Sequence, residues 1–139
     1  MSKERQKTGS TSWENVNRWY NKIVGKEGHY YHRHVILPKL LDYLKKSKPK
    51  KLLDLACGQG VLARCLSGNI QYTGIDLSPS FIEEAKRHSF DEEYLVGDIT
   101  KPLPLKDTNF DCVTIILAIQ DVKEAKKALL NASKHLVSG

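Results

Sequence analysis

From position 51 onward, short apolar runs alternate with segments whose apolar residues recur every three or four positions. The runs predict β-strands and the periodic segments predict helices. Strands alternating with helices are typical of a parallel sheet built from right-handed crossovers, so the pattern predicts an α/β fold. The predicted strands are 51–56, 71–76, 93–96 and 110–119, and the predicted helices are 61–66, one that begins at Ser78–Pro79, and 122–136.

The strand predicted at 110–119 is the most apolar stretch of the chain, so we expect it to be buried on both faces. The residues before position 51 show a different pattern of apolar and polar positions. Residues 1–11 are polar and are expected to be a disordered tail. Helical spacing then follows from Trp13 to Val24, and a second helix is expected to begin near Val35 or Leu37, because Pro38 fits only in a first helical turn. The predicted organisation is a tail at 1–11, a helical segment at 12–48 and an α/β core at 49–139.

A length of 139 residues is that of one domain. No apolar run reaches the roughly 18 residues of a membrane-spanning helix, and the polar N-terminus lacks the apolar core of a signal peptide. We therefore expect a cytoplasmic protein without a membrane span. Three widely spaced cysteines, none in a CxxC pair, are expected to be reduced and mostly buried: Cys57, Cys65 and Cys112.

The formal net charge is +6, and much of the excess lies in the lysine cluster at 45–51. Clustered lysines can neutralise nucleic-acid phosphates. They also favour the carboxyl end of a helix dipole, and no aromatic residues interleave with them here. We favour the helix-end interpretation and do not expect nucleic acid as a partner.

Candidate chemistry gathers where the predicted strands end, which is where open α/β sheets bind ligands. The first strand runs into Gly58 and Gly60, glycines that let a backbone turn sharply beside a ligand. Taken alone, Gly58-x-Gly60-x-x-Ala63 also satisfies a dinucleotide-binding pattern.

Carboxylates follow the next two strands. Asp76 ends the second strand, where a carboxylate can accept hydrogen bonds from both hydroxyls of a ribose. Asp98 follows the third and can accept from an adenine amino group. The alternatives are that Asp76 only caps the next helix and that Asp98 only forms an Asx turn. We expect Asp76→Ala to weaken cofactor binding with little change in the stability of the fold.

Four segments together, in this order and spacing, resemble class I S-adenosylmethionine-dependent methyltransferases: 52–60, 74–79, 97–98 and 110–113. The resemblance covers roughly residues 50–139. It implies a Rossmann-like parallel sheet in strand order 3-2-1-4, N-terminal lid helices and S-adenosyl-L-methionine as cofactor. The family's complete sheet has seven strands, in order 3-2-1-4-5-7-6. We therefore interpret the chain as truncated after the fourth strand, which leaves an apolar sheet edge open to self-association. We expect the chain to be less stable, or more prone to self-associate, than a version extended to complete the sheet.

The resemblance also implies residue roles. The methionine end of the cofactor would be held by Asp54 and the backbone of Ala56, Cys57 and Gly58, with Gly60 completing the loop. Asp76 would bind the ribose, and Leu77 would pack on the adenine. Asp98 and Ile99 would flank the adenine, and Ile116 and Leu117 would contact the methionine moiety. No catalytic residue is assigned; the candidates are Tyr20, Tyr31, His32 and Asp121.

The histidines at 29–34 resemble part of a lid over the methyl-donor pocket. They lack the i, i+4 pair of a helical zinc site, so no metal is expected. The favoured function is methyl transfer to a small molecule, because the tetrapeptides that the family uses for base methylation are absent from 117–120. Two alternatives stay open: a non-catalytic S-adenosylmethionine-binding partner subunit and an NAD-binding oxidoreductase domain.

Overall fold

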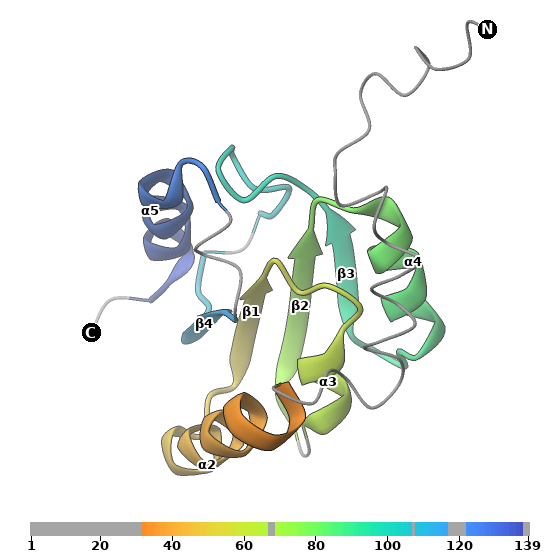
Figure 1. Cartoon of the computed structure of the whole chain (residues 1–139). Coiled ribbons are helices and arrows are strands. Elements are labelled where there is room, and N and C mark those ends of the chain that lie inside the picture. The colour runs from red at the N-terminus through yellow and green to blue at the C-terminus, as the bar shows by residue number, and fades with distance from the viewer. Residues whose placement is uncertain (1–31, 67–68, 107, 117–121, 138–139) are drawn as a thin grey trace, which may run out of the picture.

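The computed structural model describes residues 32–66, 69–106, 108–116 and 122–137. These residues form a parallel sheet with helices on both faces (Figure 1). In chain order, the elements are η2 (His32–Ile36), α2 (Leu37–Ser47), β1 (Lys51–Leu55), α3 (Val61–Cys65), β2 (Gln71–Asp76), α4 (Pro79–Arg87), β3 (Glu93–Val96), β4 (Cys112–Ile115) and α5 (Ala125–His135).

The sheet has the order β3-β2-β1-β4, and every strand pair is parallel. Asp54 in β1 lies opposite Gly74 in β2 and Thr114 in β4. All four strands therefore end at the same edge, where the segments 56–60, 76–78, 97–98 and the residue Ile116 follow them. The predicted Rossmann-like fold and the 3-2-1-4 strand order are confirmed.

The two faces of the sheet belong to two apolar clusters. Leu52 and Tyr72 lie on the face covered by α2, α3 and α4, while Leu53, Leu55 and Ile75 lie on the face covered by α5. This alternation follows from the two-residue period of a strand. Leu52, Leu53, Leu55 and Ile75 have no exposed surface, so burial on both faces fixes the register of the central strands.

Two helix starts follow their predicted chemistry. Ser78 is the N-cap of α4, where its hydroxyl oxygen accepts a hydrogen bond from the Phe81 N–H at 3.3 Å, and Pro79 is the first helical residue. α2 begins at Leu37 with Pro38 in its first turn, and Lys45 and Lys46 lie in its last turn. The helix-end interpretation of these lysines agrees with that position.

The fourth strand differs from the prediction. β4 covers only Cys112–Ile115, and of its residues only Thr114 is buried. Both faces of β4 contact the core, but among the described residues its outer edge is paired only at Phe110, through a parallel bridge to Leu136. An edge position leaves its side chains half-exposed, so the prediction of burial on both faces is wrong. Residues 117–119 lie outside the described part.

Smaller differences occur elsewhere. α5 begins at Ala125, three residues later than predicted, and α3 ends at Cys65. Cys65 is also exposed, so the expectation of mostly buried cysteines holds for Cys57 alone. Within the described residues, no helix has the length and apolar character that crossing a bilayer requires. The predicted tail and most of the predicted lid segment lie outside the described residues.

Candidate functional site

The loop between β1 and α3 has an unusual backbone. Ala56, Gly58 and Gly60 have positive φ values of 60°, 58° and 78°. A Cβ at Gly60 would overlap the Tyr94 hydroxyl, so glycine is needed there for space as well as for conformation. At Gly58 a Cβ would meet no atom of the described residues within 4 Å. The two glycines thus allow a tight turn, and no side chain of the described residues packs where a Cβ of Gly58 would lie.

Asp76 ties this loop to the end of β2. One carboxylate oxygen, Oδ2, accepts a hydrogen bond from the Gly58 N–H at 2.8 Å, and the other, Oδ1, accepts from the Ser78 N–H at 3.0 Å. The Gly97 N–H donates to the Asp76 carbonyl at 3.0 Å, which brings the end of β3 to the same place. Asp76 is half-buried and braces the loop, so we now expect its removal to affect the fold as well as ligand binding.

Asp54 is buried in the sheet itself, with 2% of its surface exposed. The Tyr72 hydroxyl donates to its Oδ2 at 2.6 Å, and the Thr114 hydroxyl donates to its Oδ1 at 2.7 Å. Burial raises the pKa of Asp54 to about 6, although these two hydrogen bonds oppose the rise. The carboxylate therefore links three adjacent strands directly before the glycine loop begins.

Asp98 forms the Asx turn that was considered for it. Its Oδ1 accepts hydrogen bonds from the Thr100 N–H at 2.9 Å and from the Thr100 hydroxyl at 2.7 Å. These bonds, the hydroxyl first, lower the pKa of Asp98, so the side chain stays ionised at neutral pH. Both bonds use Oδ1, so the turn itself does not engage Oδ2.

The apolar site candidates fall into two groups. Leu77 is 47% exposed at the end of β2, as a residue that packs against a flat ligand should be. Ile99 is 7% exposed and packs in the cluster under α5, and its carbonyl accepts from the Asn131 amide at 2.7 Å. Ile116 is half-buried against the opposite cluster, and Leu117 lies outside the described residues.

The described part of the structure does not place the side chain of any catalytic candidate. Tyr20, Tyr31 and Asp121 lie outside the described residues, and only the backbone of His32 is placed, in η2. Over the described ranges, no group of three or more His, Cys, Asp or Glu side chains is arranged to hold a metal ion.

Sequence reasoning missed three partners of the site. Tyr72 and Thr114 hold Asp54, and Asn131 in α5 donates to the carbonyls of Ile99 at 2.7 Å and Lys101 at 2.8 Å. A polar residue within an apolar strand was the available signal for Asp54 and Thr114. Pairing them needed the strand register, which the sequence pattern alone does not provide.

A family model described as "Methyltransferase domain" matches residues 53–139, which begin within β1 and include every later element through α5. The chain belongs to this methyltransferase family. The match includes the glycine loop, Asp76 and Asp98. The resemblance to class I S-adenosylmethionine-dependent methyltransferases is thereby confirmed.

The names of individual relatives of this methyltransferase chain indicate different methyl acceptors. A demethylmenaquinone methyltransferase from Thermotoga maritima is 31% identical over 101 residues, which are 70% of this chain and 44% of the relative. An 18S rRNA (guanine-N(7))-methyltransferase from Bos taurus is 34% identical over 83 residues, which are 59% of this chain and 30% of the relative. The chain thus spans less than half the length of these curated relatives.

Solved structures show the same fold at lower identity. The plantazolicin methyltransferase BamL, in complex with a triazolic desmethylPZN analog and SAH, has a TM-score of 0.73 at 20% identity, with 96% of this chain and 52% of that chain covered. The cyclase SpnF also has a TM-score of 0.73 at 20% identity, with 92% and 55% covered. A methyltransferase and a cyclase match equally well, so these likenesses establish the fold and not the reaction.

Proposed function

We propose that this protein is an S-adenosylmethionine-dependent methyltransferase whose cofactor lies across the carboxyl edge of β1, β2 and β3. The observation that carries the proposal is the Gly58–Asp76 hydrogen bond of 2.8 Å, which joins the glycine loop to the acidic end of β2. A loop with positive φ values and a carboxylate beside it match the polar parts of an adenosyl amino acid.

In this proposal each segment holds one part of the cofactor. The Asp76 carboxylate, which accepts hydrogen bonds from the Gly58 and Ser78 N–H groups, would also accept the ribose hydroxyls. Leu77 would cover one face of the adenine, and Asp98 Oδ2 would accept from its amino group. Gly58 and its neighbours would hold the methionine end, because no Cβ fills the space above the loop.

S-adenosylmethionine supplies an electrophilic methyl group when it is bound. The protein then has to align the acceptor with that methyl group and exclude water. A general base is needed only if the attacking atom carries a proton. No described residue is assigned that role.

We further propose that the methyl acceptor is a small molecule. The cytoplasmic location of the protein stays a prediction. The demethylmenaquinone relatives support a small acceptor of the quinone class. A second candidate function is the methylation of RNA. It is supported by the rRNA methyltransferase relatives and by the net charge of +6. Methyl transfer from labelled S-adenosylmethionine to a reduced naphthoquinone, compared with transfer to ribosomal RNA, separates the two acceptors.

Cofactor binding is tested first and separately. In calorimetry, S-adenosylhomocysteine should bind the chain saturably and NAD should not. The reverse preference would contradict the proposal and favour the oxidoreductase alternative. Binding without label transfer to either acceptor would favour the non-catalytic alternative.

A further inference from the structure

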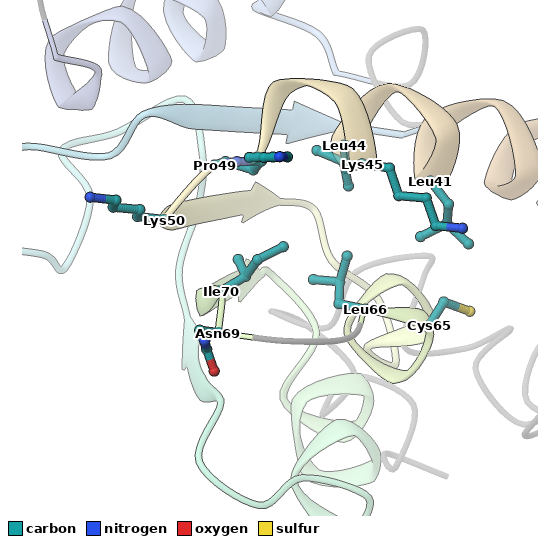
Figure 2. A pocket seen from close by; sticks show the side chains of 10 residues that line it. Leu41, Leu44, Lys45, Pro49, Lys50, Cys65, Leu66, Asn69 and Ile70 are labelled. Atoms are coloured by element: carbon teal, nitrogen blue, oxygen red, sulfur yellow. The ribbon is translucent and has the colours of Figure 1, made fainter.

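A hollow of about 570 Å³ lies at the opposite edge of the sheet from the glycine loop, near the amino ends of β1 and β2 (Figure 2). It lies between α2 and the segment that connects α3 to β2. Its volume is within the range of roughly 300–1,000 Å³ that is typical of small-molecule pockets. It contains none of the residues proposed to bind the cofactor, and nothing in the proposed function requires it.

The walls of this hollow are largely apolar. Figure 2 shows Leu44 pointing from α2 toward Leu66 and Ile70, which point back from the other side. Leu41 extends the apolar wall along α2, and Cys65, which is exposed, marks the far end. An apolar interior of this kind binds a hydrocarbon body by removing it from water.

The charged groups of the hollow all have one sign. Lys45, Lys48 and Lys50 line it, and no aspartate or glutamate of the described ranges does. Lys45 lies in the last turn of α2, and Lys48 is the residue that caps the carboxyl end of this helix with a left-handed backbone. In Figure 2 the Lys45 side chain extends along α2 toward Leu41, whereas the ammonium of Lys50 extends away from the other end, so Lys45 is the cation beside the apolar wall.

These lysines are available for a ligand. Among the described residues, no carboxylate pairs with Lys45 or Lys48, whereas their neighbour Lys46 pairs with Asp42 at 3.0 Å. A second hollow on the other side of the same connection is lined by Asp91 and Glu92 and by no lysine. The sign of charge thus separates the two hollows, and only the first suits an anion. The carboxyl end of α2 carries about half a negative charge from the helix dipole. The positive charges of Lys45 and Lys48 together exceed it.

We propose that the hollow between α2 and the α3–β2 connection binds a small amphipathic anion. The apolar body lies among Leu44, Leu66 and Ile70, and the anionic head group is held by Lys45 at the mouth of the hollow. This site is separate from the cofactor site and would be present whatever the methyl acceptor is.

The test uses the full chain with octanoate as the probe, 1-octanol as its uncharged counterpart and hexanoate as a shorter homologue. Calorimetry should show octanoate binding, at least tenfold weaker binding of octanol, and hexanoate weaker by about tenfold because it buries fewer methylenes. Lys45→Gln should weaken octanoate binding by about fivefold or more. Lys46→Gln is the matched control, because it removes the same charge from the same helix outside the hollow.

Cys65 supplies an independent readout of position. Bound octanoate should slow the alkylation of Cys65 by iodoacetamide, with Cys65→Ser used to assign the modified peptide. The proposal is overturned if octanoate does not bind, if octanol binds as tightly, if Lys45→Gln and Lys46→Gln weaken binding equally, or if saturating octanoate leaves the alkylation rate unchanged. Binding of S-adenosylhomocysteine should be the same in both lysine variants, so failure here leaves the proposed function standing.

Discussion

The carboxylate of Asp76 serves two parts of the fold at once. It accepts one hydrogen bond from the loop after β1 and another from the turn before α4. A residue that was expected to act only on a ligand therefore also braces the unliganded protein. The sequence could not distinguish these roles, because the Gly58 partner is 18 positions away and reaches Asp76 only when β1 and β2 pair.

Asp76→Ala should therefore lower both cofactor affinity and stability. We expect the affinity for S-adenosylhomocysteine to fall by roughly 30- to 150-fold, or about 2–3 kcal/mol. The free energy of unfolding should fall by about 1–3 kcal/mol, because two backbone N–H groups lose their acceptor. Calorimetry and urea denaturation measure the two effects. Asp76→Asn should cost less in both, and Asp91→Ala, an exposed carboxylate away from the site, should change neither. Unaltered affinity in Asp76→Ala would place the pocket elsewhere.

Asp54 should make the stability of the protein depend on pH. Its folded-state pKa of about 6 lies above its ordinary value of 3.8, so the folded state holds the proton more tightly than the unfolded chain does. The associated stabilisation is present below about pH 4 and is lost as pH rises through 6, a change of about 3 kcal/mol.

Asp54→Asn removes the titrating group while keeping the side chain's size. The difference in unfolding free energy between the parent and this variant, measured from pH 4 to 7, should show that loss. Parallel pH profiles for the two proteins would contradict the raised pKa.

At the scale of elements, local patterns predicted the central strands well. The predicted strand 71–76 is identical to β2, and β1 ends one residue earlier than predicted. These strands are buried on both faces. Their apolar runs and the turn residues that bound them were therefore sufficient to predict where each strand lies. The described part of β4 begins at Cys112, two residues later than predicted, and residues 117–119 of the prediction lie outside the described part. The Asp54 and Asn131 contacts were missed because they connect elements that are distant in sequence.

Asn131 should couple α5 to the position of Asp98. Its amide is buried and donates to two carbonyls of the loop that follows β3. Asn131→Ala leaves these carbonyls without their donor, so we expect a loss of about 1–3 kcal/mol in unfolding free energy and a weaker affinity for S-adenosylhomocysteine.

Urea denaturation and calorimetry would measure the two effects. Lys134→Ala, an exposed change on the same helix, is the control and should be neutral. A stability loss without any change in affinity would show that the loop holds its shape without α5.

At the scale of the whole molecule, one group of exposed apolar residues lies on and directly after α5. Leu129 and Leu130 in α5 are 55% and 52% exposed, and Leu136 and Val137 lie beside the start of β4. Together with the outer edge of β4, to which the described residues add no further strand, they form a surface that water solvates poorly.

The chain should therefore self-associate as its concentration rises. Light scattering should show this increase in mass for the parent. The double variant Leu129→Glu, Leu130→Glu should be closer to a monomer at the same concentration, with a change in unfolding free energy of no more than about 0.5 kcal/mol for each surface site. A parent that is monodisperse at every concentration would contradict the prediction.

The Gly58–Asp76 hydrogen bond also has a kinetic consequence. Because the loop is already fixed before a ligand arrives, binding does not have to order it. Association with S-adenosylhomocysteine should then be a single exponential phase whose rate rises linearly with ligand concentration. The Gly58 amide hydrogen should likewise exchange slowly with deuterium in the free protein, and a ligand that leaves the bond in place should add little to that protection.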